Sequence, residues 1–519
     1  MAQLSLTAGM DVRDRVRCCA DTELKEIVLE ALRLLDSDAN ICVRLAADLD
    51  RAAKEAKKSR LADEAWRDAF TPALPGLAAV TVASIEALDP GGLSLGIGCP
   101  RRLDAEAVFV FSMCRAHLGS VTSRAAIDRL WDSVLLHEYL DARGLQMPSR
   151  SSLHAYLNQV SAATHEYLLN AQTRLLIRDG LEDGQQLAID SFSVEGSTQW
   201  PTDSNLIQRL LARAHRLGGK LDRFGLPVFS QAYIPAWLKE LHRLDFTIAC
   251  TAGKAHSTRK VKQCYRQFLG RAAKLASRLV RECNRHRATW AAVALVPSQR
   301  RQLDALLAQL DGSLHAALRV SQYAEDRVFN GIVLPAAEKV LSLADDCAAY
   351  IAKGGREPVI GYKPQVARSG QGFITAIEIM AGNPNDAARL VPMVEQHLQR
   401  TGIVPKTLTV DDGYSSRKAV LTLKGQGVVT VSISGAKGKR ITAAADWESE
   451  AYRRARADRS AVESQIFTLR HKFHLYRFSR RGLDAVRAEL MEKVIAYNLL
   501  RASVIRRRLR EAAAAAPAA

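Results

Sequence analysis

The sequence predicts a mixed α/β unit that a helical block interrupts after its first strand, with a helical region preceding the unit. Three observations support this fold class. Apolar residues recur at helical spacing from residue 22 to about 180, and again over 204–355. A short apolar run lies at 187–189, and strand-like runs with glycine-bearing turns follow residue 356. The expected sheet therefore combines two segments, 183–203 and 356–480, that are far apart in the chain.

The composition is typical of a soluble but strongly basic chain. Its 519 residues suffice for two to four domains. Lysine and arginine number 73 against 55 acids, which leaves a net charge of +18. Such an excess favours a polyanionic partner, most commonly nucleic acid, although a generally basic proteome would also produce it. No apolar run is long enough for a membrane span, so no membrane partner is expected.

The cysteine pattern and the N-terminal residues bear on the compartment. Nine cysteines are scattered without a C-x-x-C pair, which argues against a zinc site and against a disulfide framework. Acids and arginines occur too early for a secretory signal. We therefore expect a cytoplasmic protein.

Residues 1–182 form the expected N-terminal helical region, with a candidate helix-turn-helix near 124–178. One helix would end at Gly144, and the next would begin after Pro148 with serines available as caps. Arg150 lies at the start of this second helix, where a side chain could contact DNA. Two ordinary packed helices would show the same pattern, so both interpretations stay open.

The stretch "LAIDSFSVEGSTQWPTDSN", 187–205, ends an apolar run on Asp190. A solvated acid at a strand end, or a helix cap, would explain this residue without any function. The second acid, Asp203, is expected to cap a helix that starts near Ser204.

The helical block at 204–355 contains a concentrated positive charge. Residues 254–290 include eleven Lys or Arg and one acid, Glu282. Five of the cations recur every three or four residues and so share one helix face. We expect this basic stripe to have no acid partner on its face, which favours an anionic ligand over a solvated surface. Its members are Arg271, Lys274, Arg278, Arg281 and Arg285.

The segment 356–480 changes to an α/β pattern, and 481–519 is expected to be a C-terminal helix with a frayed, disordered tail. The expected elements are a hairpin with its turn at 369–372, a helix ending at Gly402, a strand in "TLTVDDGY" (407–414) that ends in acids, a strand at 427–435, and a long basic helix over 448–478.

Carboxylates occur where three of these elements would bring them together. Asp190 ends the first strand, Asp411 and Asp412 end a later strand, and Glu463 lies in the basic helix. Three such carboxylates could hold two Mg²⁺ ions, which prefer oxygen ligands. Neighbouring strand residues face opposite sides, so at most one of Asp411 and Asp412 can be a ligand.

Three blocks together resemble the signature of DDE transposases of bacterial insertion sequences, in particular the ISNCY-type group. They are "LAIDSFSVEGSTQWPTDSNLI", "TLTVDDGY" and "RADRSAVESQIFTLR". In that family an Asp precedes a "YPTDS"-like segment, a second Asp stands in D-x-G-[FY], and a helix carries R-x-x-x-E with a basic residue seven positions later. The spacing to Gly413 and Tyr414 selects Asp411 over Asp412. The segments "GNPND" at 382–386 and "SGAKGKR" at 434–440 are also similar to that group.

The resemblance implies an RNase H-like core that cleaves and transfers the strands of its own insertion sequence. Asp190, Asp411 and Glu463 would be catalytic and would bind two Mg²⁺ ions, with Mn²⁺ as a substitute. Double-stranded DNA, comprising transposon ends and target, would be the partner, with a homodimer in the synaptic complex and a location at the bacterial nucleoid.

The expected DNA contacts are all cationic. A loop after the last strand carries three of them, and the last basic helix carries Arg459 on the face of Glu463. Arg456 stands where related transposases have a tyrosine, and Arg470 where they often have lysine, so a role for that tyrosine hydroxyl is in doubt. The loop residues are Lys437, Lys439 and Arg440.

Two other functions fit the same residues. A structurally related nuclease would hydrolyse DNA without joining two ends. A DNA-binding protein derived from a transposase would have lost catalysis, although the presence of all three carboxylates argues against that.

Overall fold

The computed structural model describes residues 10–70, 102–119, 122–198, 202–226, 233–335, 338–343, 345–352 and 357–515. Its chain divides into two compact units. One comprises Met1–Ala52, Cys99–Thr198 and Cys347–Ala519, and the other comprises Ala53–Gly98 and Gln199–Asp346. In the described part of the chain, the longest helices are too polar to serve as membrane spans.

The first unit contains a five-stranded mixed sheet in the order β6-β5-β1-β7-β8. The central strand β1 pairs antiparallel with β5 and parallel with β7. The β5–β6 pair is antiparallel, and β7–β8 is parallel. This order confirms the α/β prediction and is consistent with an RNase H-like core. The strands are β1 (Gln186–Ser191), β5 (Gln365–Ser369), β6 (Ile374–Glu378), β7 (Thr407–Val410) and β8 (Thr430–Ile433).

The expected hairpin turn at 369–372 is present, where Gly372 adopts a φ of 89° and donates its backbone N–H to the carbonyl of Ser369. The segment before it leaves the main sheet. A three-stranded sheet, β2-β4-β3, contains β2 (Val194–Glu195), β4 (Val359–Tyr362) and β3 (Ala349–Ile351). Pro364 lies between β4 and β5 and has no N–H to donate, which explains the break.

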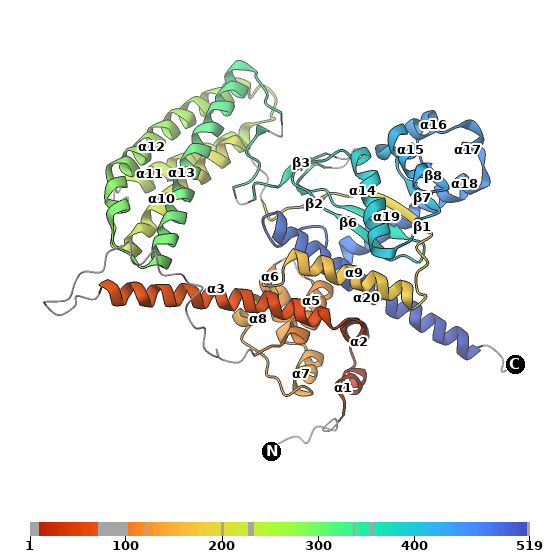
Figure 1. The fold of residues 1–519 in the computed structure, drawn as a ribbon. Helices are drawn as coiled ribbons and strands as arrows, with labels where there is room; N and C mark the ends of the chain where they lie inside the picture. Colours follow the sequence, from red (N-terminus) through yellow and green to blue (C-terminus); the bar gives the residue numbers. More distant parts are fainter. Residues whose placement is uncertain are drawn as a thin grey trace. The chain divides into compact units, whose positions relative to one another are not determined.

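Helices pack on the strands of the main sheet (Figure 1). Helix α14 packs on β5 and β6 and ends at Gly402, which has a φ of 72°. Helix α19 packs on β1 and β5. The helices of this half are α14 (Leu390–Thr401), α15 (Arg417–Gly425), α16 (Ala436–Ile441), α17 (Ala444–Glu448), α18 (Glu450–Ala457), α19 (Arg459–His471) and α20 (Leu483–Ala515).

The N-terminal helices of this unit pack around α20, which contacts α2, α5 and α9. Helix α20 continues to Ala515, so the tail expected to be frayed is helical that far, because alanine, arginine and glutamate are strong helix formers. The preceding helices are α1 (Val12–Cys18), α2 (Thr22–Ser37), α3 (Asn40–Phe70), α5 (Ala105–Leu118), α6 (Ser123–Trp131), α7 (Val134–Asp141), α8 (Arg150–Leu157) and α9 (Ala162–Arg178).

Three expected helices are each divided in two. Ser133 separates α6 from α7 with an extended backbone, and Asp458 separates α18 from α19. Between α8 and α9, the Ser161 hydroxyl accepts from the Thr164 N–H at 3.2 Å, and its own N–H donates to Asp48 at 2.8 Å. At Ser161, a polar side chain that satisfies a backbone N–H favours a new helix start over continuation of α8.

The second unit is dominated by four long helices that pack side by side (Figure 1). Their core consists of leucines together with aromatic residues such as Phe268. Thr202, rather than Asp203, is the N-cap of the first helix and accepts from the Asn205 N–H at 3.3 Å, while Asp203 pairs with Arg327 at 2.7 Å. The helices are α10 (Asp203–Gly219), α11 (Tyr233–Thr251), α12 (Thr258–Ala292) and α13 (Pro297–Glu325), with short turns η1 (Lys220–Phe224) and η2 (Asp326–Asn330).

Candidate active site

Two of the three candidate carboxylates lie side by side at one edge of the main sheet. Ile189 of β1 is opposite Val410 of β7 in a parallel pair, so the next residues, Asp190 and Asp411, leave the same edge. Asp190 is only 8% exposed and accepts from the Ser191 N–H at 2.7 Å. Asp411 accepts from the Gly413 N–H at 2.9 Å. Local hydrogen bonds therefore orient both carboxylates.

Helix α19 brings the third carboxylate to the same place. A cavity of about 650 Å³ is bordered by the ends of β1 and β7 and by one face of α19. Glu463 contributes to this lining, and its Oε1 accepts from Arg459 Nη2 at 2.5 Å. Residues separated by three or four positions share one helix face, which explains why several side chains of α19 border the cavity together. The lining residues are Asp190, Ser191, Phe192, Ser193, Asp411, Arg459, Glu463, Ile466, Phe467, Arg470 and His471.

The donor chemistry of this cavity suits a hard divalent cation, because carboxylate oxygens are the preferred ligands of Mg²⁺. Among the described residues, however, no three acidic, histidine or cysteine side chains converge closely enough to form a complete metal site. Glu463 is instead paired with Arg459. Metal coordination by all three carboxylates therefore requires Glu463 to exchange this arginine for the metal.

Asp412 points away from the cavity and caps α16. Its carboxylate accepts from the N–H of Gly438 at 2.8 Å and of Lys437 at 3.2 Å. Burial alone would raise the pKa of Asp412, but these backbone hydrogen bonds hold it below its ordinary value. A Cβ at Gly435 would lie 2.6 Å from Asp412 Cγ, so this close approach requires glycine. The pair Asp411–Asp412 thus has one member in the cavity and one that fixes the following loop.

A buried polar network for which the sequence predicted no function lies beside the two strand-end aspartates. Lys363 Nζ lies 3.1 Å from Asp386 Oδ1, and Gln365 Nε2 donates to the same oxygen at 2.7 Å. The Tyr414 hydroxyl donates to Gln365 Oε1. Burial, followed by the negative charges of Asp386 and the two strand-end aspartates, raises the pKa of Tyr414 far above its ordinary value. The "GNPND" segment was a signal for Asp386, whereas Lys363 had none.

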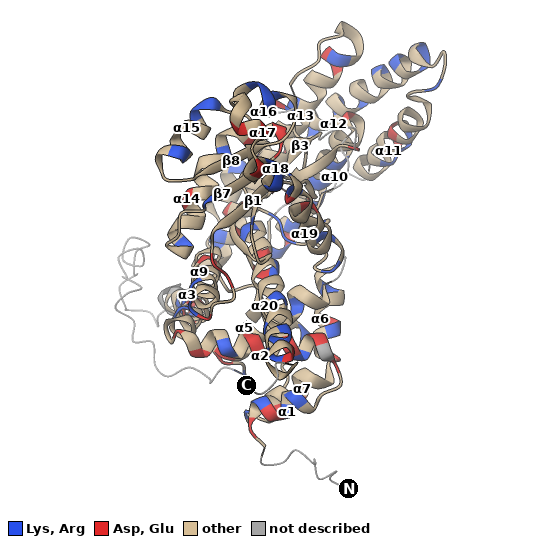
Figure 2. Cartoon of the chain, turned by 90° about the vertical axis from the view of Figure 1, so that its right-hand side faces the viewer, with Lys and Arg blue, Asp and Glu red and all other residues tan. Residues whose placement is uncertain are grey.

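The basic residues predicted on the catalytic half lie in different environments. Arg459 and Arg470 line the cavity. The three cations of α16 are exposed, and Figure 2 shows lysine and arginine along α15 and α16. Arg456 does not line the cavity, since its guanidinium lies 4.2 Å from the Trp447 ring centroid and 5.4 Å from that of Tyr452. The α16 residues are Lys437, Lys439 and Arg440.

Arg150 makes several intramolecular contacts at the start of α8. It pairs with Asp128 at 2.7 Å and Asp132 at 3.2 Å, and its guanidinium lies 4.1 Å from the Trp131 ring centroid. Two acids of α6 thus balance a charge that we had expected to be available for DNA. A DNA contact by Arg150 would have to compete with these bonds.

Residues of the basic stripe of α12 also contact side chains of a neighbouring helix. Arg271 pairs with Glu240 of α11 at 2.9 Å. Arg278 lies over Tyr233 and Trp237, with centroid distances of 4.7 and 5.1 Å. The expectation of a stripe without an acid partner was wrong at Arg271, because the partner comes from a neighbouring helix.

The remaining stripe residues are more accessible. Arg285 pairs at 3.2 Å with Glu282, the single acid of the basic segment, so the expectation was wrong at this position as well. Lys274 and Arg281 are exposed. These two residues are the members of the stripe best placed to contact a polyanion.

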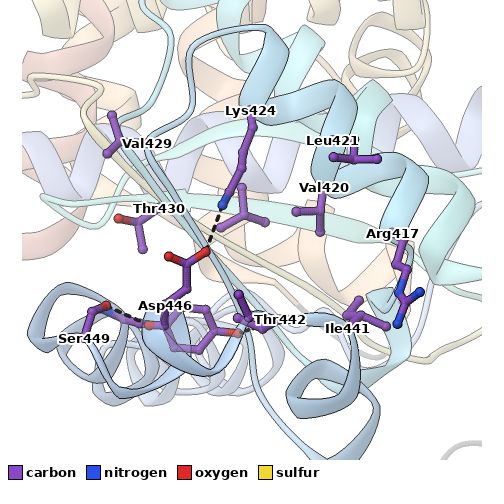
Figure 3. A pocket seen from close by; sticks show the side chains of 13 residues that line it. Arg417, Val420, Leu421, Lys424, Val429, Thr430, Ile441, Thr442, Asp446 and Ser449 are labelled. Carbon is purple, nitrogen blue, oxygen red and sulfur yellow. Dashed lines mark hydrogen bonds and ion pairs between the residues drawn. The ribbon is translucent and has the colours of Figure 1, made fainter.

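A second cavity of about 280 Å³ lies between α15, β8 and the segment from α16 to α18 (Figure 3). Its lining mixes apolar and polar side chains, with Val420 and Leu421 on one wall, and a 3.0 Å ion pair joins Lys424 to Asp446. None of the three candidate carboxylates borders it. Its lining therefore lacks the three carboxylates that could bind divalent metal ions.

Comparison with protein families finds a match for the C-terminal part of the chain. Residues 341–499 match the family model described as "Transposase DDE domain". This range includes Asp411 and Glu463 but begins after Asp190. No curated protein and no solved structure matches the chain. The resemblance to DDE transposases is confirmed over the range that holds the second and third sequence blocks, while the ISNCY-type grouping stays a prediction.

Proposed function

We propose that this chain, which carries a transposase DDE domain over residues 341–499, cleaves and transfers DNA strands at the cavity bordered by Asp190, Asp411 and Glu463. The observation that carries the proposal is the meeting of these three carboxylates, from distant parts of the chain, around one cavity. The DNA would be the ends of the chain's own bacterial insertion sequence, of the ISNCY-type group, and its target.

The residues around the cavity have distinct roles in this proposal. Asp190 and Asp411 are the rigid ligands, since neighbouring strands fix both. Glu463 would be the mobile ligand, because it is held by Arg459 and would have to leave this arginine to bind a metal. Arg459, thus released, and Arg470 then contact the phosphates of the strand being cut. Two Mg²⁺ ions, when bound, would activate the attacking oxygen and stabilise the leaving 3′-oxygen.

We further propose the roles of the other regions and of the assembly. Residues 1–182 would bind the transposon ends and 204–355 would contribute additional DNA contacts, while 183–203 with 356–480 forms the RNase H-like catalytic core and 481–519 completes it. Two copies of the chain would bring two DNA ends together in the bacterial nucleoid.

Substitution of the carboxylates tests the proposal. Asp190→Asn, Asp411→Asn and Glu463→Gln should each abolish cleavage of the DNA that flanks the reading frame, yet leave binding to that DNA largely intact. Asp484→Asn, at an exposed position, is the matched control and should cleave normally. Activity should persist with Mn²⁺. Retention of cleavage by any one of the three variants, or a requirement for Zn²⁺, would contradict the assignment.

A nuclease is the second candidate function, and the same carboxylates favour it equally. Strand transfer separates the two. A nuclease would cut the flanking DNA without joining its 3′-ends to a second molecule, whereas a transposase would yield joined products. A wild-type chain that binds this DNA but neither cuts nor joins it would instead indicate a DNA-binding protein with decayed catalysis.

A further inference from the structure

One aromatic side chain in the catalytic cavity has no structural reason to be there. Phe467 lies on α19 four residues after Glu463, and it lines the same cavity. Its exposed fraction is 64%, so it contributes little to the core. Isolated exposed apolar residues are common on protein surfaces. The informative feature is its position between Glu463 and Arg470 on the helix face that borders the carboxylates.

The neighbours of Phe467 form a defined platform. The His471 ring lies 4.1 Å from the Phe467 ring, centroid to centroid, at an interplanar angle of 39°. Phe467, His471 and Arg470 all border the cavity. An aromatic face beside arginine is the surface on which proteins stack unpaired bases, because every base presents a π-face and the cation attracts the phosphates.

The spacing along α19 relates this platform to the scissile bond. Four residues correspond to about 6 Å of helix, so the Phe467 ring lies near the place where a strand held at Glu463 would present its next base. A base can reach a side chain in this way only when it has left the duplex stack.

We propose that Phe467 stacks against an unpaired base of the DNA strand that enters the cavity, next to the phosphodiester held at the carboxylates. The inference rests on the proposed function and identifies part of its substrate as unstacked DNA. His471 supports the ring from one side, and Arg470 contacts the adjoining phosphate.

Binding measurements without metal test this role independently of catalysis. The probes are a blunt duplex and the same duplex with a short unpaired 3′ extension that contains 2-aminopurine, whose fluorescence changes when it leaves or joins a stack. The full-length chain should prefer the extended probe. Phe467→Ala should reduce this preference by about 5- to 150-fold and remove the fluorescence change.

Two further variants separate stacking from other effects. Phe467→Trp should restore both the preference and the fluorescence change, because a larger aromatic ring can still stack. Leu509→Ala is the control, since Leu509 is 55% exposed on α20 and does not line the cavity. It should bind both probes as the wild type does.

Three outcomes would overturn the inference. The wild type may show no preference for the extension, Phe467→Ala may keep the full preference, or Phe467→Ala may change only the association of two copies of the chain. Normal binding of the blunt duplex, together with loss of cleavage in the carboxylate variants, would leave the proposed function intact in each case. Failure of the wild type to bind either probe would count against the proposed function itself.

Discussion

Replacement of Glu492 by glutamine should destabilise the first unit severely. Glu492 lies on α20 and is 2% exposed. Its carboxylate accepts from Arg115 Nη2 of α5 at 2.6 Å and from Arg480 Nη2 at 2.8 Å. Arg115 also donates to the Leu157 carbonyl at the end of α8. One carboxylate therefore joins the N-terminal helices to the C-terminal helix.

The expected loss of folding free energy follows from the two arginine charges that Glu492→Gln leaves in place. Burial alone would raise the pKa of Glu492, but Arg115 and Arg480 outweigh it and hold the pKa at about 2, against an ordinary value of 4.5. This depression corresponds to about 3 kcal/mol. Glutamine would leave two largely buried guanidinium groups without their counter-charge, and removal of one partner from a buried pair typically costs about 3–5 kcal/mol. We expect a loss within that range.

The pH dependence provides an internal check. A carboxyl whose pKa is lower in the folded state stabilises the fold above the unfolded pKa and loses this contribution as the pH falls towards the folded pKa. The stability difference between the wild type and Glu492→Gln should therefore be complete at pH 7. It should shrink as the pH falls from 4.5 towards 2, where Glu492 becomes protonated.

Urea unfolding, followed by circular dichroism, measures the effect. Glu511→Gln is the matched control, because Glu511 lies on the same helix, is 69% exposed and approaches Arg507 only to 3.9 Å. An exposed pair of this kind contributes at most about 1 kcal/mol. Equal losses for the two variants at pH 7, or a Glu492→Gln loss that does not change with pH, would refute the reasoning.

Three further predictions concern the function. Asp386→Asn should lower the cleavage rate by about 10- to 100-fold and raise the Mg²⁺ concentration needed for half activity, because the polar network beside the ligands loses its charge; an unchanged metal titration would contradict it. Asp412→Ala should cost about 1 kcal/mol in thermal unfolding and speed hydrogen exchange at α16, which loses its cap; wild-type exchange there would argue against the capping role. Replacing both Lys274 and Arg281 with Gln should lower the slope of log affinity against log salt by about 1.8, and an unchanged slope would identify a solvated face.

The sequence alone determined the elements in which local pattern dominates. Short apolar runs and turn residues placed the strand that leads to Asp190, the strand that leads to Asp411 and the turn at Gly372 near their observed positions. The spacing to Gly413 and Tyr414 selected Asp411 over Asp412, and the structure places only Asp411 in the cavity. Opposite strand faces do not separate the two aspartates, because β7 ends at Val410 and both aspartates follow it. The inferences that succeeded each depend on residues a few positions apart.

The tertiary structure alone decided which distant groups meet. The acid that pairs with Arg271 comes from another helix, and the two acids that hold Arg150 precede α7 in the chain. Similarly, Phe467 lies in the same cavity as Asp190 only because α19 packs on β1. Charges and rings act through space over a few ångströms, and the packing of helices and the register of strands decide which residues come within that distance.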